Sequence, residues 1–116
     1  MIKPEMFDTV ELLVDLPDVQ LHAGAQGAIV QAYSEDVFEV EFIDEAGQTL
    51  ALGALSTTQF IVVWRNANHA WVTADEQAAQ LVSRLREPDR REVIDFARHL
   101  HVRRARTAPQ TQVAGQ

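Results

Sequence analysis

The N-terminal half of the chain is broken into short stretches in which apolar and polar residues alternate. The clearest stretch runs from Val37 to Phe42, where every second residue is apolar and the residues between are Glu39 and Glu41. Because successive side chains of a β-strand point to opposite faces, this stretch predicts a strand with one buried and one exposed face. The side chains expected on the buried face are Phe38, Val40 and Phe42.

Turn-forming residues separate this stretch from four further strand candidates. The five expected strands are 7–14, 28–33, 37–42, 49–55 and 60–64. Pro17 ends the first because it has no N–H to donate, and Gly47 is expected at a left-handed turn position. Five such short strands bury little surface in a flat sheet, so the sheet is expected to curl onto itself. The expected fold is therefore mainly β, a small five-stranded, SH3-like, partly open barrel over residues 1–64.

A helical pattern replaces this alternation in residues 73–106. Thr73 and Glu76 fit a capping box at the start of a first helix. Pro88 suits the first turn of a second helix. The apolar stripes expected on these helices are Ala78, Leu81, Val82 and Leu85, then Val93, Phe96, Ala97 and Leu100.

These helices predict a helical hairpin that extends the barrel. A connector over residues 65–72 precedes it, and a disordered tail over residues 107–116 follows. Each large apolar side chain of the hairpin gains about 1.5–3 kcal/mol on burial, so the stripes need a cover. Packing on the barrel is the simplest expectation, and packing on a second copy or on another protein are the alternatives.

Three blocks of the barrel segment resemble a known domain family. They are Phe7-Asp8-Thr9-Val10-Glu11-Leu12-Leu13-Val14-Asp15-Leu16-Pro17, Gly24-Ala25-Gln26-Gly27-Ala28-Ile29-Val30 and Phe38-Glu39-Val40-Glu41-Phe42-Ile43-Asp44-Glu45-Ala46-Gly47. In this order they resemble a bacterial domain of unknown function, family number 4926 of its series. The resemblance implies an SH3-like barrel without catalytic residues. Its members also resemble small partners from toxin and immunity gene neighbourhoods.

The C-terminal part carries a second, shorter resemblance. Residues 85–96, Leu85-Arg86-Glu87-Pro88-Asp89-Arg90-Arg91-Glu92-Val93-Ile94-Asp95-Phe96, resemble the helical tails of some small antitoxin proteins. The resemblance implies a helix that starts with Pro and charged residues, continues with a Val-hydrophobe-Asp-Phe core and finishes in a basic end.

Charge is divided unevenly along the chain. Residues 1–64 hold one Lys, no Arg and eleven Asp or Glu, a formal charge of −10, whereas residues 65–116 hold nine Arg and six acids, a charge of +3. An acidic barrel repels the phosphate groups that dominate nucleic-acid affinity, and it attracts a basic protein. The pattern therefore predicts a basic protein partner and disfavours nucleic-acid binding by the barrel.

Candidate partner-binding residues follow from this charge. They are Glu35, Asp36, Glu39, Glu41, Asp44, Glu45 and Trp71. Trp64 and Trp71 flank the connector, where they are expected to seal a joint between packed elements. If they are exposed, they would instead anchor a partner, because Trp is enriched in binding hot spots.

No constellation of residues indicates catalysis, so an enzyme is not expected. Glu39 and Glu41 would lie about 7 Å apart on one strand face, where solvated carboxylates are the simpler interpretation. The chain has no cysteine, its serines lack a nucleophile elbow, and its histidines lack metal-ligand spacing. We therefore expect no cofactor and no metal.

The chain is expected to reside in the cytoplasm. It shows no signal-peptide pattern and no apolar run approaching the roughly 18–20 residues that span a bilayer, so no membrane partner is expected.

These observations favour a non-catalytic protein-binding module, an antitoxin or immunity-type inhibitor of a basic partner. Two alternatives stay open. One is a structural homo-oligomer assembled through the C-terminal helices. The other is a nucleic-acid-associated regulator that uses the Arg-rich tail, although the simplest interpretation of that tail is a solvated helix face.

Overall fold

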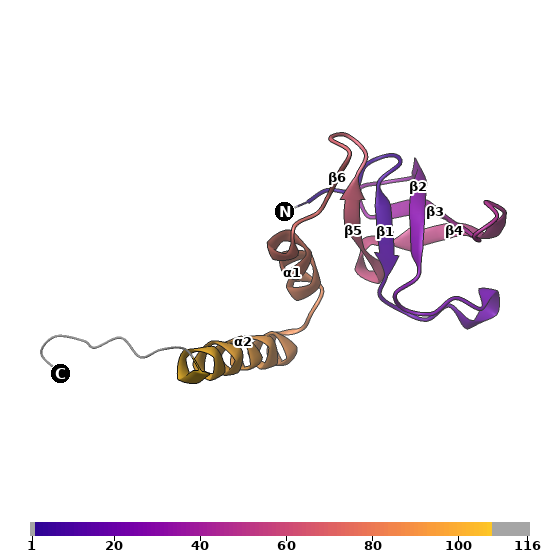
Figure 1. The fold of residues 1–116 in the computed structure, drawn as a ribbon. Helices are drawn as coiled ribbons and strands as arrows, with labels where there is room; N and C mark the ends of the chain where they lie inside the picture. The colour runs from indigo at the N-terminus through magenta and orange to yellow at the C-terminus, as the bar shows by residue number, and fades with distance from the viewer. Residues whose placement is uncertain (1, 108–116) are drawn as a thin grey trace, which may run out of the picture. The chain divides into compact units, whose positions relative to one another are not determined.

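A computed structural model describes residues 2–107 and divides into two compact units, Met1–Arg84 and Leu85–Gln116. The first unit contains an antiparallel sheet and one helix, and the second contains one long helix (Figure 1). The strands are β1 Thr9–Leu12, β2 Gln26–Ala32, β3 Val37–Ile43, β4 Thr49–Ser56, β5 Phe60–Arg65 and β6 Ala70–Trp71. The helices are α1 Ala74–Ser83 and α2 Glu87–Thr107, and the short 3-10 turns are η1 Pro17–Val19 and η2 Thr57–Gln59.

The six strands form one open sheet in the order β4-β3-β2-β1-β5-β6. The mainly β, partly open barrel followed by helices is thus confirmed, with one strand more than the five predicted. The additional strand, β6, lies inside the predicted connector and pairs Ala70 and Trp71 with the end of β5. Its two residues carry no alternation, which is why the sequence pattern did not reveal it.

The barrel core is formed by the inward faces of the strands. Its buried residues are Val10, Leu12, Leu21, Ile29, Phe38, Val40, Phe42, Leu55, Phe60, Val62 and Val72. Phe38 of β3 meets Phe60 of β5 edge to face, with ring centroids 6.2 Å apart, so distant strands are joined through the core. The prediction that Phe38, Val40 and Phe42 are buried is confirmed.

The first strand is shorter than predicted, because the chain turns at Phe7 and Asp8. Phe7 adopts a left-handed φ of 67° and is exposed. The buried Asp8 carboxylate accepts hydrogen bonds from the Glu5 and Asn66 amides, each 2.9 Å long. The alternation from Phe7 to Val14 could not reveal this turn, since Asn66 approaches Asp8 only in the folded chain.

Helix α1 begins where predicted but presents an unexpected face to the sheet. The Thr73 hydroxyl oxygen accepts a hydrogen bond from the Glu76 amide at 3.2 Å, so the N-cap is confirmed. The predicted apolar stripe is only partly right: Ala78 and Leu81 are exposed and Val82 and Leu85 are half-buried, while the fully buried side chain of this helix is Gln80.

Polar side chains of α1 and of the residue that follows it bind main-chain groups of the barrel. The Gln80 amide accepts from the Val62 N–H and donates to the Val62 carbonyl, both at 2.8 Å. The Arg84 Nε donates to the carbonyls of Thr57 and Phe60, at 2.9 and 3.2 Å. Burial lowers the pKa of the Arg84 guanidinium from its ordinary value. Because β6 pairs only with the end of β5, the main-chain groups of Val62 have no strand partner there, and Gln80 satisfies them.

Helix α2 contains Pro88 in its first turn, as predicted. Glu87 and Arg91, one turn apart on this helix, form an ion pair with an N–O distance of 3.5 Å. None of its described side chains is buried within the second unit. The packing of its stripe and the joining of α1 and α2 into a hairpin stay predictions. The predicted tail lies outside the described residues apart from Thr107, the last residue of α2.

None of the helices formed by residues 2–107 combines the length and the apolarity needed to cross a membrane.

Candidate protein-binding surface

The outer face of β3 carries the two carboxylates that the alternation predicted there. The register of the sheet places Glu39 opposite Ala54 of β4 and Glu41 opposite Leu52 of β4. Both carboxylate side chains are partly buried between the neighbouring strands. The strand therefore holds them in defined positions rather than leaving them on a mobile loop.

Hydrogen bonds direct these two carboxylates differently. Glu39 accepts a hydrogen bond from the Tyr33 hydroxyl, which lies just after the end of β2. Glu41 accepts one from the Thr49 hydroxyl at 2.8 Å, which holds its carboxylate near β4. The two acids are therefore not equivalent, and Glu41 is the one presented beside β4.

The Tyr33–Glu39 hydrogen bond affects the titration of the phenol. It raises the pKa of Tyr33 above the ordinary value, with burial and the negative charge of Glu39 as smaller contributions. The phenol must remain protonated to donate to the carboxylate, so this bond opposes ionisation.

Replacing Glu39 by glutamine is expected to lower the Tyr33 pKa toward the ordinary value. The neutral amide accepts a weaker hydrogen bond and adds no negative charge beside the phenolate. Tyr33 is the chain's one tyrosine, so ultraviolet absorbance followed against pH reports it alone. Glu41→Gln is the matched control and is expected to leave this titration unchanged. An unchanged Tyr33 pKa in Glu39→Gln would contradict the contact.

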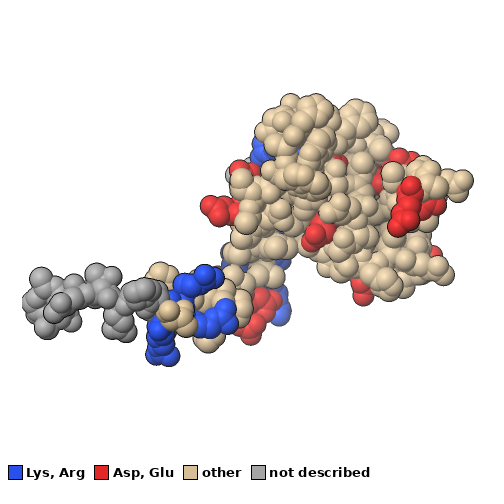
Figure 2. Space-filling model, viewed as in Figure 1, with Lys and Arg blue, Asp and Glu red and all other residues tan. Residues whose placement is uncertain are grey.

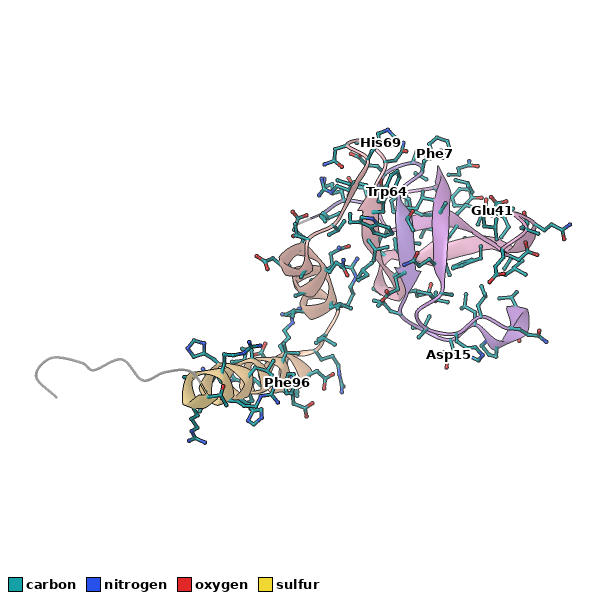
Figure 3. The ribbon with its side chains drawn as sticks, in the orientation of Figure 1. Phe7, Asp15, Glu41, Trp64, His69 and Phe96 are labelled. Atoms are coloured by element: carbon teal, nitrogen blue, oxygen red, sulfur yellow. The ribbon has the colours of Figure 1, made fainter. Side chains whose placement is uncertain are left out.

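Exposed apolar side chains border Glu41. Ile43, Leu50 and Leu52 are 54%, 56% and 56% exposed. Glu41 and Ile43 also line a shallow hollow of about 270 Å³ on this face. We call Glu39, Glu41, Ile43, Leu50 and Leu52 the β3–β4 outer patch, and Figure 3 labels Glu41 within it. An apolar area bordered by charged side chains is typical of a protein-binding site.

The other predicted acids lie outside this patch. Glu35 and Asp36 occupy the loop before β3 and line a separate hollow of about 480 Å³ with Lys3 and Arg84. Asp44 and Glu45 occupy the loop after β3, where the Asp44 carboxylate accepts from the amides of Ala46 and Gln48. The two loops lie at opposite ends of β3, which is about 20 Å long. The six acids therefore do not form one compact cluster.

Trp71 is separated from all of these acids. It lies on β6, at the opposite edge of the sheet from β4, and is 66% exposed. It pairs across the strands with Trp64, whose ring centroid is 5.6 Å from that of His69. The half-buried Trp64 and the exposed Trp71 therefore differ in environment, and Figure 3 shows Trp64 and His69 in a different part of the barrel from Glu41.

Sequence reasoning missed the apolar members of the patch, Ile43, Leu50 and Leu52. The sequence did contain a signal for Leu50 and Leu52. Together with Ala54 they occupy every second position of an expected strand that contains no charged residue, so they share one face of it. Their position beside Glu41 depends on the register between β3 and β4, which residue order does not display.

Acidic side chains dominate the charged surface of the barrel unit, and arginines are numerous on α2 (Figure 2). Residues 2–107 contain no group of three or more His, Asp or Glu side chains arranged to hold a metal ion. What the patch offers is an apolar surface with negative charge at its border, which suits binding to a complementary surface.

Residues 6–62 match the sequence model of a family described as Domain of unknown function (DUF4926). No curated protein and no solved structure matches the chain.

Proposed function

Because residues 6–62 form a domain of the DUF4926 family, whose function is unknown, we propose a role from the geometry: a non-catalytic module that binds a basic protein. The class that we propose is an antitoxin or immunity-type inhibitor. The observation that carries this proposal is the β3–β4 outer patch, in which exposed apolar side chains adjoin two positioned carboxylates.

The charge of the barrel supports a basic partner. Residues 1–64 carry a formal charge of −10, and a field of this sign accelerates encounter with positively charged proteins. The apolar side chains of the patch supply contact area that excludes water around the charged border. The negative charge of the barrel would thus speed the encounter with a basic partner, and the apolar side chains of the patch would supply the affinity.

Neutralising the patch carboxylates with Glu39→Gln and Glu41→Gln is expected to weaken binding of a basic partner by about tenfold at low ionic strength. The partner is first isolated by co-purification with the tagged full chain from its source cells. Its dissociation constant is then measured by titration calorimetry at two salt concentrations. The difference between variant and parent should shrink as salt increases, because salt screens exposed charges.

The matched control removes two charges from helix α2. Glu92→Gln with Asp95→Asn changes the net charge by the same amount, and both side chains are exposed. We expect this control to bind within about threefold of the parent, because long-range charge contributes less than charge at the contact. Equal losses in both variants would show that only net charge matters, and no loss in either would overturn the proposal.

Helix α2 favours a second candidate, self-association through the C-terminal helices. Over 21 residues it buries no described side chain within its unit, while Ile94, Phe96 and Val102 are exposed. A helix without packing is only marginally stable in water, so a second copy would stabilise it. The variants Glu39→Gln and Glu41→Gln separate the two candidates. They lie outside α2, so they would leave the affinity of self-association unchanged, whereas they should weaken the binding of a basic partner.

A further inference from the structure

The two edges of the sheet differ in whether their outward main-chain groups are paired. The outer edge of β5 is closed by the Gln80 side chain, which binds both main-chain groups of Val62 as a neighbouring strand would. The other edge is β4, which pairs with β3 on one side only. β4 has eight residues without a charge or a proline, the devices with which edge strands usually avoid further pairing.

The outward main-chain groups of β4 are identified by the hydrogen-bond alternation of the sheet. The Val37 carbonyl accepts from the Tyr33 amide on the β2 side, and the Asp44 amide donates to Gln48 on the β4 side. N–H and C=O of one residue share a direction, and the direction alternates along a strand. Residues 38, 40 and 42 of β3 thus face β4, and their partners are 55, 53 and 51.

Leu52 and Ala54 therefore direct their amides and carbonyls away from β3, toward the open edge. Within residues 2–107 no other hydrogen bond occupies these groups. A strand laid along this edge would pair with both residues and continue the sheet.

A hollow of about 260 Å³ adjoins the same edge on the inner face of the sheet. Its lining is mostly apolar and comes from residues 16–19 around η1, together with Phe42 and residues 51–55. Gly53 has no side chain to fill this hollow, and no atom lies within 4 Å of the position that a Cβ would occupy there. The hollow can therefore receive apolar side chains of an added strand.

We propose that an extended, basic segment of a partner protein adds to β4 as a seventh strand. The proposal rests on the proposed function and names its docking mode. Alternate side chains of the segment, apolar ones, enter the hollow, and the intervening Arg or Lys side chains lie over Leu50 and Leu52. Their aliphatic stems cover these leucines while the cationic ends remain in water.

Charge selects a basic segment over a second copy of this chain. Glu41 lies one strand inside the edge and is held near β4 by Thr49. An added strand would be about 9.6 Å from β3, a span that an Arg and a Glu side chain bridge together. Asp18 lines the hollow as well. A second barrel would instead bring another −10 to this edge.

The test uses the full chain and a synthetic peptide of about ten residues that alternates Val and Arg, with a peptide that alternates Val and Glu as its control. Fluorescence anisotropy measures affinity, and amide hydrogen exchange followed by NMR locates the contact. We expect the Arg peptide to bind at least about tenfold more tightly than the Glu peptide. Exchange at the Leu52 and Ala54 amides should slow on binding.

Ala54→Pro tests the main-chain pairing directly. Proline removes the outward N–H, places its ring toward the added strand, and leaves the β3–β4 hydrogen bonds intact. It is expected to weaken peptide binding by about tenfold or more. Ala54→Thr keeps the N–H and suits a strand, so it should bind the peptide at least about tenfold more tightly than Ala54→Pro. The thermal unfolding midpoint reports whether both variants remain folded.

The outcomes separate this inference from the proposed function. If a folded Ala54→Pro binds the Arg peptide as tightly as Ala54→Thr does, strand addition is wrong, whereas weakening by Glu41→Gln would still support an acidic binding face. Absence of peptide binding also overturns the inference. Slowed exchange at Leu52 and Ala54 that grows with protein concentration alone would assign the edge to a second copy instead.

Discussion

Replacing Gln80 by leucine is expected to lower the free energy of unfolding by about 3 kcal/mol. Leucine fills a similar volume but cannot bind the Val62 N–H or carbonyl, which the Gln80 amide satisfies at 2.8 Å each. Gln80 is 1% exposed, so water does not replace these bonds without a rearrangement of α1. Each main-chain group left without a partner in such a site costs about 1–3 kcal/mol.

Urea unfolding followed by circular dichroism measures this loss. The matched control is Leu81→Gln, which exchanges the same two residue types in the opposite sense at the next position of α1. Leu81 is exposed, so its replacement should change the free energy of unfolding by less than about 0.5 kcal/mol. A Gln80→Leu variant as stable as this control would show that the hydrogen bonds to Val62 do not hold α1 on the sheet.

Replacing Gly27 by alanine is expected to destabilise the barrel by about 3 kcal/mol. A Cβ at this position would lie 2.8 Å from Cγ1 of Val40 and 2.9 Å from both the Glu41 carbonyl oxygen and Cδ1 of Phe42. The carbonyl belongs to the β3 main chain, and both side chains are buried in the core. Relief of these contacts therefore requires β2 and β3 to separate, which is a form of overpacking.

Gly53→Ala is the matched control for this prediction. Gly53 also lies in a strand, but a Cβ there would meet no atom within 4 Å. Alanine also reduces the conformational entropy of the unfolded chain, so Gly53→Ala should be neutral or stabilising by about 0.4–1 kcal/mol. The two glycine variants are thus expected to change the urea midpoint in different ways. Similar midpoints for both would contradict the close approach at Gly27.

The strands were largely predictable because their signals are local. The alternation from Val37 to Phe42 was enough to separate core side chains from exposed ones. Gly47 has the expected left-handed φ, 82°, since the geometry of a tight turn depends on the residues within it. Thr73 caps α1 for the same reason, because an N-cap bond joins residues three positions apart.

The face with which α1 packs was not predictable in this way. Its apolar periodicity favoured Ala78 and Leu81, but the barrel side offered unpaired main-chain groups of β5 rather than an apolar surface. Two buried hydrogen bonds to Val62 require a polar side chain at that contact, and Gln80 supplies it. Periodicity assumes an apolar partner surface, so it did not identify Gln80.

Gly27 shows the same limit in the core. Glycines between strands commonly serve a turn or a bulge, and the residue order around Gly27 gives no sign of another role. In the structure it lies inside β2, opposite Val10, where the absence of a side chain lets Val40 and Phe42 approach. The close approach involves residues of another strand, which residue order alone does not bring together.

The candidate site, too, was predictable from the sequence only in part. Alternation within β3 placed Glu39 and Glu41 on one exposed face, and composition made the barrel acidic, because both properties follow from residue order. Pairing across strands decided that Leu52 lies beside Glu41, that Trp71 is at the far edge, and that the acids of the two loops are apart. It also decided which edge of the sheet is closed. The main-chain groups of Val62 are hydrogen-bonded to Gln80, eighteen residues along the chain, whereas the main-chain groups of Leu52 and Ala54 of β4 face outward. Strand periodicity, caps and turns arise from interactions between neighbours in sequence, whereas register and edge closure depend on groups that only folding brings together.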